Sequence, residues 1–166
     1  DLDSQYPEVV TGTYDANIHK QDSNRFKRNV VANTNGQWPQ PKIPYKIAQY
    51  FSELDKKKFL TAMKTIEDLT RYNGKDCITF VNQTNEKIYI QFVNATGCGS
   101  QIGYQGKVQS IYLSVFCRLN GIVMHELLHM LGLPHEQSRP DRDEFIEINT
   151  TNIKQSKLTL LSFLVF

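Results

Sequence analysis

The sequence predicts an α+β fold, in which a mixed sheet has helices packed against it. Residues 52–73 carry apolar side chains at spacings of three to five, which indicates an amphipathic helix. Short runs rich in β-branched and aromatic residues lie before and after this helix, separated by glycine or asparagine clusters, and predict strands. The 166 residues, 40% hydrophobic and 22% charged, are enough for one soluble domain with a core.

The first predicted elements are a strand over residues 43–47 and the helix over residues 52–73. Because proline cannot donate a hydrogen bond within a sheet, Pro44 predicts that this strand lies near a sheet edge or that Pro44 is at its start. Ser52 and Asp55 resemble a capping box, and Gly74 supplies the stop. The helix is interpreted as a core-packing element, and its expected apolar face consists of Leu54, Phe59, Met63, Ile66, Leu69 and Tyr72.

Three further strands are predicted over residues 77–82, 87–93 and 108–115. The second is almost continuously apolar, as expected for a strand covered on both faces. A second helix is predicted over residues 122–131, where strong helix formers and apolar residues end at Gly132.

Charge and hydropathy exclude two classes of partner. The net charge is +2, and no basic run is interleaved with aromatic residues, so nucleic acid is not indicated. No apolar stretch approaches the roughly 20 residues that span a bilayer, so no membrane span is expected.

Sequons and cysteines together favour a secreted, extracellular protein. The sequons at Asn82, Asn94 and Asn149 are candidate glycosylation sites. Three cysteines, Cys77, Cys98 and Cys117, lack Cys-x-x-Cys spacing, which disfavours a cysteine zinc site and favours one disulfide plus a leftover thiol. The chain opens at Asp1 without Met, which fits either a removed signal peptide or a fragment.

Residues 1–28 are polar, lack sustained periodicity and end in Arg25-Phe26-Lys27-Arg28. This pattern predicts a pro-segment that a processing protease removes by cutting after Arg28. The other interpretation of the tetrapeptide is a solvated charge cluster.

The segment HELLHMLGLPHE, residues 125–136, holds three of the four histidines. On a helix, His125 and His129 project from one face, about one turn apart, which lets both rings reach one ion at about 2.0–2.1 Å. Gly132 lets the chain turn back so that His135 becomes a third ligand, and Glu126 is placed to accept a proton from water at the open position. A lone buried histidine is more often a core residue, but His-Glu-x-x-His-x-x-Gly-x-x-His is the metzincin signature.

The longer segment HELLHMLGLPHEQSRPDRDEFI resembles the extended zinc signature of the astacin family. Residues 97–117 are similar to the family's stretch between two disulfide-bonded cysteines, and Trp38-Pro39 with residues 43–45 match its mature amino-terminal region. The resemblance covers about residues 25–154. The residues after the third histidine that sit at matching places are Glu136, Arg139, Asp141, Arg142 and Asp143.

The resemblance implies a metzincin-like N-terminal subdomain with a twisted, mixed, mainly parallel sheet and two long helices. It also implies one Zn²⁺ per chain, held by His125, His129 and His135, with Glu126 as the general base. Cys98 would pair with Cys117. Residues 108–114 resemble the family's cleft-edge strand, which would pair with an extended peptide or protein substrate.

For the zymogen, the resemblance implies that Glu136 meets the new amino group of Asn29 after cleavage. An aspartate of the pro-segment would occupy the fourth zinc position until then. The candidate is Asp15, although its surroundings depart from the family's Phe-x-Gly-Asp pattern, and Asp22 is the alternative.

The resemblance ends at about residue 154, and the apolar tail over residues 155–166 diverges from it. The expectation is therefore an incomplete catalytic domain over residues 29–154, with most of the C-terminal subdomain absent. That region would hold the family's methionine turn, a tyrosine near the zinc and a partner for Cys77. The tail is interpreted either as a substitute strand over the core or as a read-through sequence that promotes aggregation.

Three functions remain open at this point. The first is a secreted zinc metalloendopeptidase of astacin type, made as a zymogen, in which zinc-bound water attacks the peptide bond with help from Glu126. The second is a truncated, inactive zinc-binding secreted glycoprotein, and the third is a structural domain without metal.

Overall fold

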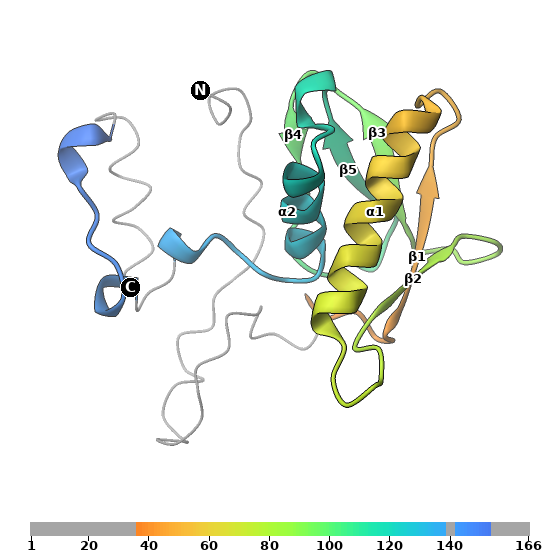
Figure 1. The fold of residues 1–166 in the computed structure, drawn as a ribbon, viewed down its shortest axis with the longest axis horizontal. Coiled ribbons are helices and arrows are strands. Elements are labelled where there is room, and N and C mark those ends of the chain that lie inside the picture. The colour runs from red at the N-terminus through yellow and green to blue at the C-terminus, as the bar shows by residue number, and fades with distance from the viewer. Residues whose placement is uncertain (1–35, 139–141, 154–166) are drawn as a thin grey trace.

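The computed structural model describes residues 36–138 and 142–153. Two long helices, α1 (Glu53–Thr70) and α2 (Asn120–Met130), lie side by side on one face of a five-stranded sheet (Figure 1). The sheet order is β2-β1-β3-β5-β4, with parallel pairing except between β4 and β5. The predicted α+β class, with a mixed and mainly parallel sheet, is confirmed.

Three of the four predicted strands are shorter than the runs that predicted them, the first is one residue longer, and a fifth strand was not predicted. The four predicted strands correspond to β1 (Lys42–Ile47), β2 (Thr79–Asn82), β3 (Ile90–Asn94) and β5 (Gln109–Leu113). The fifth strand, β4 (Cys98–Gly99), has only two residues. β1 lies next to the edge strand β2, and its pairing with β3 begins at Tyr45, one residue after Pro44.

The expectation that residues 108–114 form an edge strand is wrong. β5 pairs with β3 on one side and with β4 on the other, so it lies inside the sheet. The edge is β4, in which Cys98 is opposite Leu113 and Gly99 is opposite Tyr112. A two-residue strand that contains glycine has no alternating pattern by which a sequence reveals it.

Helix α1 begins as predicted and ends earlier. Ser52 is its N-cap, and the Ser52 hydroxyl accepts a hydrogen bond from the Asp55 backbone N–H at 3.1 Å. The helix ends at Thr70, and Gly74, with φ +74°, belongs to the turn that follows. Three side chains of the expected apolar face lie near the ends of this helix and are exposed instead of buried: Leu54, Leu69 and Tyr72.

The core lies between the sheet and the two helices. Alternate strand residues point toward the helices and are buried, among them Ile43, Ile90, Phe92, Ile111 and Leu113. α1 contributes Phe59, Ala62, Met63 and Ile66, and α2 contributes Val123, Leu127 and Met130. Because burial of each large side chain is worth about 1.5–3 kcal/mol, this layer supplies the main hydrophobic stabilisation of the described residues.

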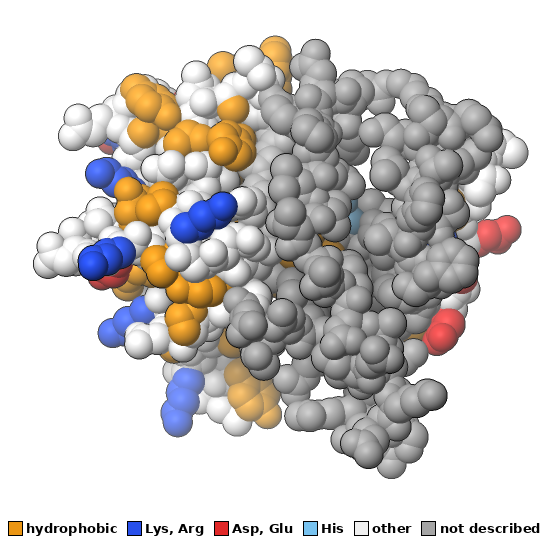
Figure 2. All heavy atoms as spheres, turned by 180° about the vertical axis from the view of Figure 1, so that it is seen from behind, with side chains coloured by type: hydrophobic (Ala, Val, Ile, Leu, Met, Phe, Trp, Pro, Cys, Tyr) orange, Lys and Arg blue, Asp and Glu red, His pale blue; other side chains and the backbone are white. Residues whose placement is uncertain are grey.

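The opposite face of the sheet carries no described helix. In β3, Gln91 and Val93 on that face are half-buried, whereas Ile90 and Phe92 on the helix face are buried, so the two faces of this strand are unequally covered. Figure 2 views the molecule from this side, and apolar side chains are interspersed there with Lys and Arg. Within the described residues, neither helix combines the length and apolar character needed to cross a bilayer.

Candidate metal centre

The first two candidate ligands are placed by helix α2. His125 and His129 are one turn apart, with His125 exposed and His129 only 8% exposed. The ring centroids are 4.3 Å apart. Buried Val123, Leu127 and Met130 anchor this helix to the core, so the direction of both rings is fixed by packing.

The third candidate ligand returns to the helix through a Schellman motif. Gly132 has φ +98°, its N–H donates to His129 O at 2.8 Å, and the Leu133 N–H donates to Leu128 O at 3.0 Å. This left-handed conformation favours glycine, which carries no Cβ penalty there. The reversal brings His135 back against the two helical histidines.

The three Nε2 atoms converge. They are separated by 2.9 Å for His125–His129, 3.0 Å for His129–His135 and 3.2 Å for His125–His135. Among the described residues this is the group whose ligand atoms lie close enough together to share one ion. Nitrogens bound to one tetrahedral zinc at about 2.0–2.1 Å are about 3.3 Å apart, so the spacing fits this metal.

A hydrogen bond sets the tautomer of His129. Its Nδ1 donates to the Leu133 carbonyl oxygen at 2.7 Å, and a carbonyl can only accept. In neutral His129 the lone pair is therefore on Nε2, toward the other two rings. Lone pairs that converge at this spacing repel one another unless a cation lies between them, so the donor set fits a metal centre.

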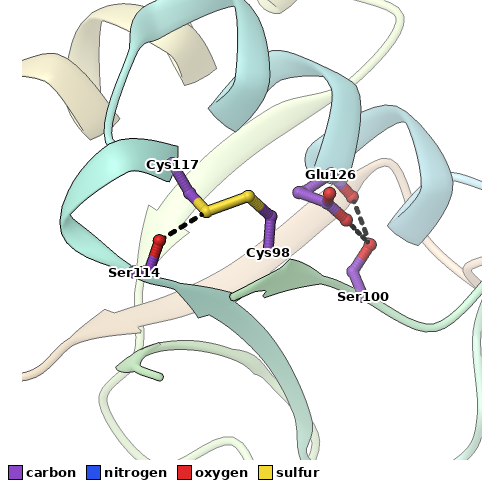
Figure 3. Close-up of a disulfide and its surroundings, with 5 residues drawn as sticks. All are labelled: Cys98, Ser100, Ser114, Cys117 and Glu126. Atoms are coloured by element: carbon purple, nitrogen blue, oxygen red, sulfur yellow. Dashed lines mark hydrogen bonds between the residues drawn. A yellow bond between two sulfur atoms is a disulfide. The ribbon is translucent and has the colours of Figure 1, made fainter. Parts of the chain in front are cut away.

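Glu126 follows the first histidine and is only 5% exposed. The Ser100 hydroxyl donates to Glu126 Oε2 at 2.7 Å and also lies 3.0 Å from the Glu126 main-chain oxygen. Figure 3 shows Ser100 reaching from the end of β4 to this carboxylate. The sequence does not predict this contact of Ser100, since no local pattern connects residues 26 positions apart.

A polar clamp of three residues, Trp38, Gly103 and Gln109, holds the carboxyl end of α2. Trp38 Nε1 donates to Met130 O, and the Gly103 N–H donates to His129 O, both at 2.8 Å. Fully buried Gln109 donates to Gly103 O at 2.8 Å and so holds the Gly103 loop in place. The ring of Tyr104 packs edge-on against Trp38, with centroids 5.1 Å apart.

The other end of α2 is fixed by a disulfide and an arginine. Cys98 and Cys117 form a disulfide with a Cα–Cα distance of 5.7 Å (Figure 3). Cys77 is an exposed free cysteine. Arg118 donates to Asp55 Oδ2 at 3.0 Å and to Asn94 Oδ1 at 2.6 Å. Burial raises the pKa of Asp55, but hydrogen bonds from Ser52 and Arg118 outweigh it and hold this pKa below its ordinary value.

Some of the other predicted residues lie on the surface, and others lie outside the described part of the chain. Glu136 begins a 3₁₀ turn, η4 (Glu136–Ser138), and is exposed. The sequon residues Asn82, Asn94 and Asn149 are also exposed. Residues 1–28 with Asp15 and Asp22, the cleavage site, Asn29, Arg139, Asp141 and residues 155–166 lie outside the described residues. Asp143 is exposed and Arg142 is buried, both in η5 (Arg142–Glu144).

Sequence comparison links the chain to known metalloproteinases. High choriolytic enzyme 1 of Oryzias latipes is 42% identical over 113 residues, which are 67% of this chain and 39% of that protein. Zinc metalloproteinase nas-13 of Caenorhabditis elegans is 37% identical over 129 residues, 77% of this chain and 27% of that protein. Tolloid-like protein 1 of Homo sapiens is 36% identical over 137 residues, 81% of this chain and 13% of that protein. The chain thus spans less than half the length of these relatives.

Structural comparison and a family sequence model agree with these relatives. The solved structure of High choriolytic enzyme 1, a hatching enzyme zinc-protease from Oryzias latipes, is similar with a TM-score of 0.62 at 37% identity, covering 78% of this chain and 60% of that chain. The sequence model of the peptidase family described as Astacin matches residues 30–163. This chain therefore belongs to the astacin family of peptidases.

Proposed function

We propose that this protein is a zinc-dependent endopeptidase of the astacin type that hydrolyses peptide bonds in peptides or proteins. The observation that carries the proposal is the convergence of three Nε2 atoms within 2.9–3.2 Å, beside a buried glutamate on the same helix. His125, His129 and His135 hold one zinc ion per chain. When bound, zinc lowers the pKa of a water ligand toward 7 and polarises a carbonyl group.

Residues of this chain supply proton transfer, orientation of a ligand ring and pairing with the substrate. Glu126 accepts a proton from the attacking water and passes it to the leaving amine nitrogen. The Nδ1–H of His129, held by Leu133 O, keeps the ring in the orientation that presents Nε2. A substrate in extended conformation adds to the sheet at the free edge of β4, which among described residues pairs only with β5.

The processing steps belong to the same proposal. Residues 1–28 are a pro-segment, Asp15 or Asp22 blocks the zinc centre before cleavage, and a protease cuts after Arg28. The new Asn29 amino group then forms an ion pair with Glu136. In this proposal residues 29–154 carry the astacin-like catalytic part of the chain and residues 155–166 form a tail, although the family match extends to residue 163. Glu136 is exposed and directly follows the third histidine, which supports its place in this proposal.

Secretion is also part of the proposal. Disulfides persist in oxidising compartments, and the described residues contain the bridge between Cys98 and Cys117. The sequon residues Asn82 and Asn94 are the last residues of β2 and β3, and both are exposed, as a glycosylation site requires.

Replacement of Glu126 tests the mechanism. Glu126→Gln keeps the size of the side chain but cannot accept the proton, so we expect kcat to fall at least about 100-fold with zinc content unchanged. Hydrolysis of a casein-derived peptide is measured with zinc present, before and after cleavage following Arg28, and metal content is measured by atomic emission. Glu53→Gln, an exposed glutamate on α1, is the control and keeps full activity.

The outcomes separate the candidate functions. Full activity in Glu126→Gln contradicts the role of this glutamate. A wild-type chain that binds one zinc and a peptide but does not hydrolyse it supports the inactive zinc-binding glycoprotein. Folded protein without zinc supports the structural domain.

A further inference from the structure

We infer that Ser100 is a positioning residue that fixes the Glu126 carboxylate, with Oε2 held by the Ser100 hydroxyl and Oε1 left as the oxygen that accepts the proton. The inference rests on the proposed function of Glu126. The observation behind it is that one serine hydroxyl contacts both ends of the glutamate, at 2.7 Å from Oε2 and 3.0 Å from the main-chain oxygen (Figure 3).

This contact restricts a side chain that otherwise has several rotamers. Glu126 is 5% exposed, so it is largely removed from bulk solvent, and a buried charged group needs a hydrogen-bond partner. Within the part of the chain that the structure describes, the Ser100 hydroxyl is the donor found for this carboxylate. With Oε2 engaged, Oε1 is the oxygen available for chemistry.

Two contacts of the residues just before Ser100 fix its position. It follows β4 directly, and Cys98 in that strand is bonded to Cys117. The Gly97 carbonyl accepts from the Ser114 N–H at 2.8 Å, so the start of β4 is fastened to β5 as well. Ser100 thus belongs to the strand edge that we propose for substrate pairing, and one short segment would align both the substrate and the base.

Loss of this contact should slow the proton-transfer step and should not weaken substrate binding. A base displaced by about 1 Å can lose on the order of 100-fold in rate, because proton transfer needs hydrogen-bond distance and alignment. The backbone of β4, which would pair with substrate, remains in place when only the hydroxyl is removed. Loss of the hydroxyl is therefore expected to lower kcat and to leave KM nearly unchanged.

The kinetic test compares three variants of the zinc-loaded protein after cleavage following Arg28. We expect Ser100→Ala to lower kcat about 10- to 100-fold, with KM changed less than about twofold and zinc content unchanged. Ser100→Thr retains the hydroxyl and is expected to keep kcat within about threefold. The matched control is Ser110→Ala, which removes a serine hydroxyl that accepts from Gln91 on β3, at 2.9 Å, and keeps full activity. An unchanged kcat in Ser100→Ala, or a raised KM alone, overturns the inference.

A second measurement does not depend on activity. Ser100→Ala, Glu126→Ala and the double variant are compared by thermal unfolding of the zinc-loaded protein. If Ser100 holds Glu126, the double variant lowers Tm by less than the sum of the two single shifts, since each removes the same contact. Additive shifts overturn the inference. If wild-type protein hydrolyses no peptide, the proposed function fails, and this cycle alone decides whether Ser100 holds Glu126.

Discussion

Helices α1 and α2 cover the same face of the sheet, yet they are held there by different means (Figure 1). α1 relies on an apolar stripe of Phe59, Ala62, Met63 and Ile66 and on the Ser52 cap. α2 also buries Val123, Leu127 and Met130 in the core, but it has no side-chain N-cap, and polar contacts fasten both of its ends in addition. The first type of attachment is spread over many contacts that each tolerate small shifts. The second fixes individual backbone atoms, which is what a helix carrying metal ligands requires.

Substitutions that weaken the attachment of α1 and those that weaken the attachment of α2 should therefore affect different properties of the protein. Substitutions in the apolar stripe of α1 should lower the free energy of unfolding, while the folded molecules keep their affinity for zinc. Damage to the polar clamp of Trp38, Gly103 and Gln109 should lower zinc affinity more than it lowers stability.

The largest expected effect on stability is that of Phe59→Ala. Phe59 is fully buried, stacked on Phe92 with centroids 5.1 Å apart and edge-on against Phe51. Its truncation should lower the free energy of unfolding by about 3–5 kcal/mol, measured by urea unfolding. Leu60→Ala, on the same helix but 46% exposed, is the control and should cost about 0.5 kcal/mol or less.

The result for zinc decides whether the comparison holds. We expect folded Phe59→Ala protein to bind zinc with an affinity within about threefold of the wild type in competition with a chromogenic chelator. A large loss of affinity in this variant would show that the metal centre depends on the whole core and not on its polar clamp.

The complementary change is Trp38→Phe. It keeps an aromatic ring but removes the Nε1–H that donates to Met130 O at 2.8 Å. Partners outside the ligand set are worth about 10- to 100-fold in metal affinity, so we expect a loss of about 10-fold. Removal of one neutral hydrogen bond should cost about 1 kcal/mol of stability. Chelator competition and urea unfolding give the two quantities.

The control for this variant is Tyr104→Phe, which leaves the ring that packs on residue 38. It should keep zinc affinity within about twofold. Trp38 is the only tryptophan of the chain, so its fluorescence in the wild type also reports the clamp directly. An emission spectrum that does not change when zinc is added would count against a coupling between Trp38 and the metal centre.

The two regions also differ in how far the sequence predicts them. The three-to-five spacing predicts α1 and the burial of Phe59, Met63 and Ile66, since a helix presents one face at that period. The same period fails for Leu69 and Tyr72, because the helix ends at Thr70 and its last turn extends past the core.

For the metal centre, sequence spacing predicts the histidines but not the groups that fix them. His125, His129 and the Gly132 turn are local, so their spacing carries geometric information. Ser100 is 26 residues from its partner Glu126 in the sequence, and Trp38 is 92 residues from its partner Met130. Strand β4 is too short to show an alternating pattern. The order of strands in the sheet likewise depends on contacts that no local period encodes, which is why β5 was expected at the edge.

The smallest expected effect concerns the ion pair that joins the two regions, Asp55 with Arg118. Because the pKa of Asp55 is lowered in the folded state, the unfolded state binds more protons in acid. The resulting stability is fully present above the ordinary aspartate pKa of about 4 and is lost as pH falls through the lower folded value. Asp55→Asn lacks this contribution, so the stability of the wild-type protein should fall more steeply than that of the variant between pH 6 and pH 3.

Urea unfolding of both proteins at pH 6, 4 and 3 measures this difference, and protonation of the histidines is common to both and cancels. Glu53→Gln is the matched control in the same helical turn, since its partner Lys56 forms an exposed ion pair worth about 0–1 kcal/mol. A gap between wild type and Asp55→Asn that stays constant over this pH range would mean that the Asp55 charge does not tie α1 to the segment before α2. The start of α2 would then depend on the disulfide and on the packing of its apolar residues.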